Sequence, residues 1–206
     1  MKTVSTAYEQ TGRTGQKQRT RQALVDVARA LIEDGEPAPT VDQVATASGI
    51  SRTTAYRYFS SQRSLLVAAH PEIDRASLVP ADAPNDPQAR FLAVVDAFIG
   101  LTVESDGQLR AMLRLSLSEP TERDNLPLRQ GRAVGWFDEA LLDLEPPLGS
   151  EQRRRLVFAV RSAVGIESLV WLTDVGGLSR SDAADVMRSS ARALLTQAFA
   201  DQDSSS

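Results

Sequence analysis

The chain has 206 residues, of which 42% are hydrophobic and 24% charged, which is ordinary for a globular protein of one large or two small domains. It has no cysteine and one histidine, His70. These counts exclude disulfides, thiolate metal sites and cysteine nucleophiles, and argue against a Ser-His-Asp triad or a multi-histidine metal site. The net charge is −4, but residues 1–70 hold 9 Lys/Arg and 6 Asp/Glu, whereas residues 71–206 hold 14 and 21.

Residues 1–19 are polar and show no helical periodicity, so we expect a mobile N-terminal arm. The arm has no apolar signal region, and no later apolar run approaches ~20 residues. We therefore expect no membrane-spanning segment and a cytoplasmic location. The basic residues at the arm's end are Arg13, Lys17, Arg19 and Arg21. The default interpretation is that they belong to a solvated, disordered arm. The alternative is that the arm reaches the minor groove or the phosphates of DNA.

The N-terminal third of the chain predicts four helices. The first runs from about Thr20 to a stop at Gly35, because apolar residues recur there every three to four positions. Thr40 is suited to cap a second helix and Ser51 a third, while the fourth starts at about Ser61. We take residues 20–70 as one domain.

Residues 71–87 predict a connecting helix or linker. Pro71 either kinks the fourth helix or begins a new one. The stretch VPADAPNDP, residues 79–87, has three prolines and almost no apolar content, so we place the domain boundary there.

Residues 88–201 read as helices throughout. One stripe of apolar residues runs from Phe91 to Ile99, and a second, from Leu109 to Leu117, ends near Pro120. A third, from Trp136 to Leu144, ends at Pro146-Pro147. A long helix then runs from a Ser150 cap to about Val175, and a last one from a Ser179 cap to about Asp201. Residues 202–206 are expected to be a disordered tail. The prediction is an all-α fold with a larger helical domain after the N-terminal one.

Three residues between the second and third helices predict a helix-turn-helix. Ala45 is small where two helices would cross, Gly49 tolerates the positive φ of a tight turn, and Ser51 begins the next helix abruptly. The N-terminal turn of the third helix is then free to enter a DNA groove.

The third helix, ISRTTAYRYF from Ile50 to Phe59, buries little, because Ala55 and Phe59 are its inward pair at i, i+4. The residues predicted to approach base edges lead the helix: Arg52, Thr53 and Thr54. The residues predicted to contact phosphates are Thr40, Tyr56, Arg57, Tyr58 and Gln62. The alternative is that Tyr56 and Tyr58 are half-buried core residues and that Arg57 is only solvated.

The stretch TVDQVATASGISRTTAYRYFSSQRSLLVAA, residues 40–69, resembles the DNA-binding region of the TetR family of bacterial transcriptional regulators. The family pattern joins a Thr-initiated helix, Ala-x-x-x-Gly-Val-Ser, Tyr-x-His-Phe and Ser-Lys-x-x-Leu. The residues that match it are Ala45, Gly49, Ser51, Tyr56, Phe59, Ser61 and Leu65. Two depart from it: Tyr58 replaces a histidine, and Gln62 replaces a lysine that grips a phosphate, so one ionic contact per subunit is in doubt.

The resemblance implies that the second domain binds a small molecule and forms a homodimer through its last two helices. Residues expected at that interface are Leu156, Val160, Val164, Leu169, Leu194, Leu195 and Phe199, with ordinary intramolecular core as the alternative. Candidates for lining a pocket are Phe91, Phe98, Met112, Leu113, Trp136, Phe137, Phe158 and Trp171, with core packing as the alternative for each. Few charges fall on these stripes, which favours a mostly apolar effector.

The resulting hypothesis is a ligand-responsive regulator, most simply a homodimeric repressor, that binds a palindromic double-stranded operator and needs no cofactor or metal. It would be associated with the nucleoid when bound to DNA. One rival is a ligand-dependent interaction protein that has lost DNA binding, for which Gln62 is the hint. The other is an enzyme acting on a small apolar substrate, although the chain shows no nucleophile–base pair, phosphate-binding glycine loop or metal-ligand set.

Overall fold

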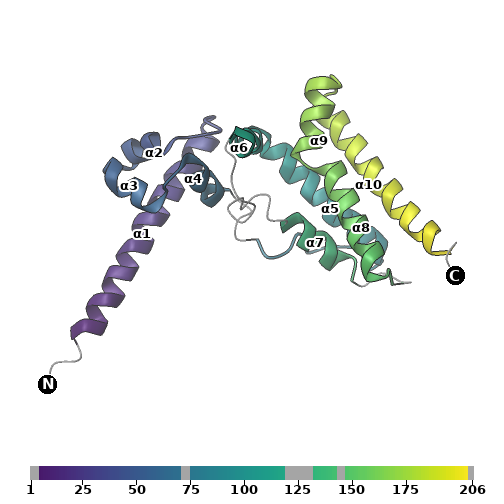
Figure 1. The fold of residues 1–206 in the computed structure, drawn as a ribbon, viewed down its shortest axis with the longest axis horizontal. Helices are drawn as coiled ribbons and strands as arrows, with labels where there is room; N and C mark the ends of the chain where they lie inside the picture. The colour runs from purple at the N-terminus through teal and green to yellow at the C-terminus, as the bar shows by residue number, and fades with distance from the viewer. Residues whose placement is uncertain (1–4, 71–74, 119–131, 143–146, 204–206) are drawn as a thin grey trace. The chain divides into compact units, whose positions relative to one another are not determined.

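A computed structural model describes residues 5–70, 75–118, 132–142 and 147–203 of the chain (Figure 1). Every regular element in these ranges is helical, which confirms the all-α prediction. The chain divides into two compact units, residues 1–74 and residues 75–206. Expectations at Pro71, Pro120, Leu144 and Pro146 lie outside the described residues, as do those for residues 204–206.

Unit 1 contains the helices α1 (Ser5–Glu33), α2 (Val41–Ser48), α3 (Arg52–Tyr58) and α4 (Gln62–Ala69). Helix α1 packs against α2 and α4, and α2 packs against α3. The buried side chains that form this core are Leu24, Val25, Ala28, Val41, Val44, Ala45, Ala55, Phe59, Leu65, Ala68 and Ala69. The four helices predicted from residues 20–70 are thus confirmed.

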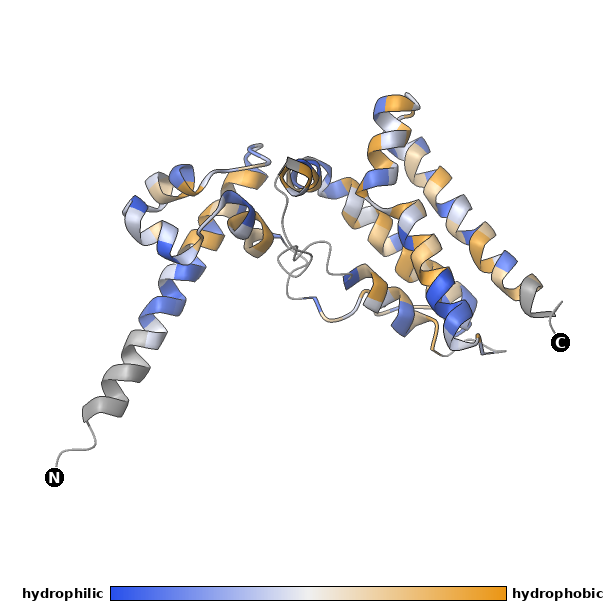
Figure 2. Ribbon diagram, viewed as in Figure 1, coloured by the Kyte–Doolittle hydropathy of each residue, from blue (hydrophilic) through white to orange (hydrophobic). Residues whose placement is uncertain are grey.

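Helix α1 is longer than the sequence predicted. It begins at Ser5, whereas residues 1–19 were expected to be an arm without regular structure. Figure 2 shows mostly hydrophilic residues along the coloured part of α1 that precedes its buried stretch. Packing at Leu24 to Ala28 nucleates the helix, and the good helix formers Gln, Lys and Arg at positions 16–19 extend it toward its start despite Gly12 and Gly15. Apolar periodicity therefore marks the packed part of a helix and not its end.

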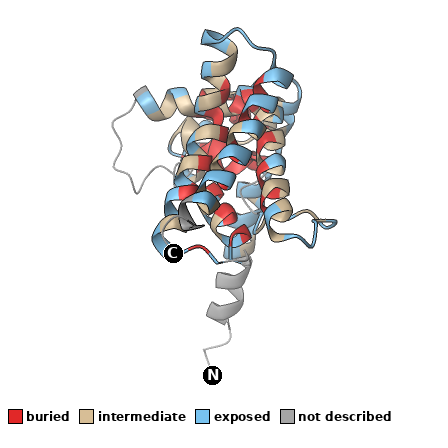
Figure 3. Cartoon of the chain, turned by 90° about the vertical axis from the view of Figure 1, so that its right-hand side faces the viewer, coloured by how far each residue is buried: buried red, intermediate tan, exposed pale blue. Residues whose placement is uncertain are grey.

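Unit 2 contains α5 (Pro87–Glu104), α6 (Asp106–Ser118), α7 (Arg132–Ala140), α8 (Ser150–Val164), α9 (Ile166–Val170), the π-helix η2 (Trp171–Val175) and α10 (Arg180–Asp203). Helix α10 packs against α8 and α5, and α7 packs against α5 and α8. Figure 3 shows the buried residues gathered on the facing sides of these helices. The largest fully buried side chains of this core are Phe91, Ile99, Phe137, Leu141, Leu169 and Met187.

The boundary between the units lies earlier than the proline-rich stretch suggested. Residues 75–86 contain no helix, yet Leu78 is buried in the core of unit 2. The indole N–H of Trp136 also donates to the carbonyl of Ala76 at 3.1 Å. The chain therefore joins the second core before residues 79–87, since a single buried leucine and one hydrogen bond are enough to attach an extended segment.

The segment from Ser150 to Val175, predicted as one helix, is interrupted. Gly165 has φ −90° and ψ −178°, an extended conformation that ends α8 and precedes α9. The hydroxyl of Ser168 donates to the carbonyl of Ser162 at 2.6 Å, so a carbonyl next to the break keeps a partner. The N-cap residue of α8 is Gly149, whereas Ser150 was expected to cap this helix. The N–H of Gly149 donates a hydrogen bond of 3.4 Å to the side-chain oxygen of Gln152.

The same segment is long enough to span a membrane, and an 18-residue window within it has a mean hydropathy of 1.5, as a membrane-spanning helix can have. Core helices of soluble proteins meet this criterion too. In unit 2 the buried members of this segment are Leu156, Val157, Val160, Val164, Ile166 and Leu169, all of which lie in the apolar core. Buried residues make up 39% of the apolar window, and the extended Gly165 interrupts the helix within the segment.

Candidate nucleic-acid interface

Helix α2 begins with a capping box that the sequence only partly predicted. The Thr40 hydroxyl accepts a hydrogen bond of 3.2 Å from the N–H of Gln43, and the Gln43 side chain accepts one of 2.7 Å from the N–H of Thr40. The Thr40 hydroxyl also donates to Gln43 Oε1 at 2.8 Å. The predicted cap is confirmed, and its hydroxyl proton is used within the protein.

The turn between α2 and α3 depends on Gly49. Its φ of +67° is left-handed, which glycine adopts without the steric cost that a Cβ brings. The N–H of Ile50 then donates to the carbonyl of Ala45 at 3.1 Å, the six-to-one bond of a Schellman ending. Ser51 follows in an extended conformation and accepts a bond of 3.2 Å from Thr54 N–H. Gly49 and Ser51 thus set the direction in which α3 leaves α2.

Helix α3 is anchored by very few residues. Ala55 is fully buried, and Phe59, directly after the helix, is almost so. The guanidinium carbon of Arg21 on α1 lies 5.2 Å from the centre of the Phe59 ring, a cation–π contact. The predicted inward pair is confirmed, and it leaves most of the helix surface free.

The outward side of α3 carries the residues expected to contact DNA. Arg52, Thr53, Tyr56 and Arg57 are exposed, with Tyr56 at 43%. Tyr58 is half-buried and packs against the core of unit 1. The half-buried alternative therefore describes Tyr58 but not Tyr56, because the two rings lie on different sides of a helix that turns 100° per residue.

The three residues predicted to approach bases differ in how they are held. The guanidinium of Arg52 forms an ion pair with the carboxylate of Asp42 on α2. Thr54 is half-buried, and its hydroxyl accepts a hydrogen bond of 2.8 Å from Ser51. Thr53 is exposed. The leading turn of α3 therefore presents one restrained cation and one exposed hydroxyl.

Gln62, the first residue of α4, points back into the protein. Its side-chain amide donates a hydrogen bond of 2.6 Å to the carbonyl of Ala38, in the loop before α2. The residue expected to contact phosphate instead ties two parts of unit 1 together, and that contact stays a prediction.

Sequence reasoning missed two residues with structural roles around the interface. Asp42 had no assigned role, although an acidic residue in the first turn of a capped helix, ten positions before an arginine, was a usable signal. Arg29 on α1 donates to the carbonyl of Ala69 at 3.1 Å and so completes the last turn of α4. That bond spans 40 positions, and a pattern in the sequence could not have shown it.

The residues predicted to line a pocket in unit 2 do not form one group. Phe91 and Phe98 both meet the ring of Phe137 edge to face, at 6.1 and 5.4 Å between centroids. Phe158 and Trp171, by contrast, are 49% and 61% exposed. The buried Phe91, Trp136 and Phe137 pack in the core of unit 2, whereas Phe158 and Trp171 lie at the surface.

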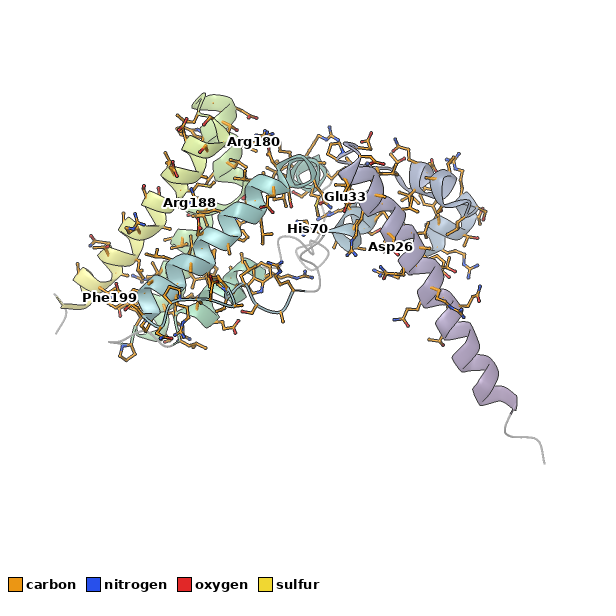
Figure 4. All side chains as sticks on the ribbon, turned by 180° about the vertical axis from the view of Figure 1, so that it is seen from behind. Asp26, Glu33, His70, Arg180, Arg188 and Phe199 are labelled. Carbon is orange, nitrogen blue, oxygen red and sulfur yellow. The ribbon has the colours of Figure 1, made fainter. Side chains whose placement is uncertain are left out.

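A surface hollow of about 260 Å³ lies elsewhere in unit 2, and none of those eight residues lines it. Its walls are Leu92, Val95 and Asp96 from α5, and Arg188 and Arg192 from α10. The guanidinium of Arg188 bonds to Asp96 across it at 2.5 Å, which raises the pKa of this arginine above its ordinary value. Figure 4 labels Arg188 on α10, where its side chain extends toward α5.

The residues predicted at a dimer interface lie mostly inside one subunit. Val160, Val164, Leu169 and Leu195 are buried in the core of unit 2, so they offer no surface to a partner. Leu194 and Phe199 are half-buried against that core. The large exposed apolar side chains in this part of the chain are Phe158, Trp171, Val175, Leu178 and Val186. Spacing on a helix could not separate the inward face from the outward one, because both helices are apolar on more than one side.

A charged network joins three elements of unit 2. Asp106, buried at the start of α6, bonds to Arg110 at 2.5 Å and to Arg180 of α10 at 2.7 Å. Arg110 also bonds to Asp174 of η2, at 2.5 Å. These bonds, the one to Asp174 first, raise the pKa of Arg110 above its ordinary value. Within the described ranges no group of His, Cys, Asp and Glu is arranged to hold a metal ion.

Comparison with known proteins bears on unit 1 most directly. Residues 24–69 match the family model of the bacterial regulatory proteins of the tetR family, a span from within α1 to the end of α4. The HTH-type transcriptional repressor LfrR of Mycolicibacterium smegmatis is 28% identical over 134 residues. That alignment covers 64% of this chain and 66% of LfrR, just under two thirds of the relative's length.

The match ends where α4 ends, and it contains the capped α2, the Gly49 turn and the exposed face of α3 described above. The residues that match the family model therefore include those that form the helix-turn-helix. Residues 24–69 thus carry the match to the bacterial regulatory proteins of the tetR family, and within this match α2 and α3 form a helix-turn-helix.

Proposed function

We propose that this chain is a homodimeric transcriptional repressor that binds a palindromic operator through α3 and is released by a small, mostly apolar effector. The observation that carries the proposal is the surface of α3, where Arg52, Thr53, Tyr56 and Arg57 are exposed around an anchor of Ala55 and Phe59. A helix whose exposed side chains carry guanidinium, hydroxyl and phenol groups is suited to form hydrogen bonds with base edges and phosphates. Repression is proposed because LfrR is named a repressor.

Homodimerisation is proposed from the exposed apolar side chains between residues 158 and 186. Water contact with tryptophan, phenylalanine and valine side chains is unfavourable, and burial in a two-fold interface removes it. A two-fold dimer would place two copies of α3 in successive major grooves of a palindrome. Effector binding to unit 2 would favour a subunit arrangement in which the two helices no longer match that spacing.

DNA binding is tested by titration of a labelled duplex from upstream of the chain's own gene. We expect a specific, salt-dependent shift that is lost in a variant with both Arg52→Ala and Tyr56→Ala. The matched control is Arg114→Ala on α6, which removes an exposed arginine from unit 2 and should leave the shift unchanged. A wild-type chain that shows no specific shift would leave the interaction-protein alternative in its place.

Dimerisation is tested separately by sedimentation of the free protein. Trp171→Glu places a charge on the exposed apolar surface and should move the mass toward that of a monomer and weaken operator binding. Leu117→Glu is the control, because Leu117 is 69% exposed, against 61% for Trp171, but lies on α6. Equal effects of the two substitutions on mass would contradict the placement of the interface.

A further inference from the structure

The arginine that leads α3 has an acidic partner on α2. Its guanidinium is paired with the carboxylate of Asp42, the second residue of α2, although the Arg52 side chain itself is 71% exposed. Asp42 is 38% exposed, and its second oxygen, Oδ1, is buried without a hydrogen-bond partner. A carboxylate with one desolvated oxygen depends on its single cationic partner, so the pair holds both side chains.

We propose that Asp42 is a positioning residue that sharpens base reading by Arg52. This inference rests on the proposed DNA binding of α3. A guanidinium carries five N–H donors, and Asp42 engages one of its nitrogens, Nη2. Donors remain for the O6 and N7 acceptors of a guanine in the major groove. An arginine that is already restrained loses less side-chain entropy when it meets that base.

The carboxylate of Asp42 also affects binding to DNA of any base sequence. Asp42 lies two residues after Thr40, at the helix start proposed to approach a phosphate. A negative charge there repels every duplex, because all of them carry the same phosphates. Only a site with guanine opposite Arg52 offsets that repulsion, so Asp42 weakens non-specific binding and increases discrimination.

A purely structural role for Asp42 makes a different prediction. An acidic residue in the first turn of a helix stabilises the helix through its dipole, whatever its neighbours are. Loss of that effect would weaken unit 1 and lower affinity for all sequences alike. A role through Arg52 would change the preference at one base position in each half-site and would vanish when Arg52 is absent.

The experiment is selection from a random duplex pool, with sequencing of the bound fraction, for the full chain and the variants Asp42→Asn, Asp42→Glu, Arg52→Ala and Asp42→Asn/Arg52→Ala. We expect Arg52→Ala to lose guanine preference at one position per half-site. Asp42→Asn should reduce preference there by about five- to tenfold. It should also raise affinity for non-operator DNA several-fold, with Asp42→Glu recovering part of the preference. Adding Asp42→Asn to Arg52→Ala should leave the base preferences of the single Arg52 variant unchanged.

Thermal melting of each variant shows whether unit 1 remains folded at the temperature of selection. The inference is overturned if Asp42→Asn lowers enrichment equally at all positions, or if its effect on preference persists without Arg52. It is also overturned if the Asp42→Asn profile equals that of the unmodified chain. An unmodified chain that enriches no sequence would instead refute the proposed function, and this inference with it.

Discussion

The side-chain amide of Gln62 lies 2.6 Å from the carbonyl oxygen of Ala38 and donates a hydrogen bond to it. The bond joins the first turn of α4 to the loop that leads into α2, across 24 positions of the chain. Family resemblance had suggested a phosphate contact at this position, where a lysine is usual. The structure gives the glutamine an internal partner, so we expect its identity to affect stability as well as the predicted phosphate contact.

Gln62→Lys should separate these two effects. The added charge at the start of α4 should steepen the dependence of log affinity on log salt by about one unit. Loss of the bond to Ala38 should lower the free energy of unfolding by about 1 kcal/mol. Operator titration at several salt concentrations and urea unfolding measure the two. Gln88→Lys, the same change on an exposed site of α5, is the control and should leave the salt slope unchanged.

Thr40→Ala should destabilise unit 1 through its helix cap. The substitution removes the acceptor for Gln43 N–H, which should cost about 1 kcal/mol in urea unfolding. Thr40→Ser keeps the hydroxyl and should retain most of the stability. If the serine variant were as unstable as the alanine variant, the methyl group and not the cap would be responsible.

Gly49→Ala and Gly100→Ala should change stability in opposite directions. A Cβ at either glycine meets no atom within 4 Å, so contacts do not distinguish the two sites. Gly49 has φ +67°, where a side chain costs about 1–2 kcal/mol. Gly100 lies within α5, where alanine should stabilise by roughly 0.5–1 kcal/mol. Urea unfolding of the two variants measures both, and a loss at Gly100 as large as that at Gly49 would contradict the conformational argument.

Asp174→Asn should reduce stability in a way that depends on pH. Hydrogen bonds from Arg110, and then from Thr173, lower the pKa of Asp174 below its ordinary value of 3.8. The folded state therefore binds this proton less readily than the unfolded state, so the carboxylate stabilises the fold above about pH 4. That contribution disappears as the pH falls through the lowered pKa. The difference in unfolding midpoint between the variant and the unmodified chain should be present at pH 7 and shrink in acid; a constant difference would assign it to another cause.

The predictions that succeeded from sequence depend on neighbours along the chain. Thr40, Ser51 and Ser179 cap the helices they were expected to cap, because a capping side chain bonds to an N–H only three residues away. Gly49 was identified for the same kind of reason, since a left-handed turn is a property of one residue. Ala55 and Phe59 were assigned inward by helical spacing alone.

The predictions that failed or stayed open depend on contacts between distant residues. The start of α1 could not be placed, because its polar extension follows from a helix nucleated by packing further along. Val160 and Leu195 were expected to face a partner, and the fold places them in the core. Which side of an apolar helix is buried is decided by the elements that pack on it, and the periodicity of that helix does not contain this information.

The sequence by itself determined the all-α class, the capped helix-turn-helix and the inward pair Ala55 and Phe59 of α3, since each follows from propensity, capping and spacing over a few positions. Only the tertiary structure decided that Arg52 is held by Asp42, that Gln62 bonds to Ala38 and that Phe158 and Trp171 lie at the surface. The physical reason is that hydrogen bonds, ion pairs and burial form between groups that are near in space. Where those groups are far apart in the chain, their meeting is a property of the fold.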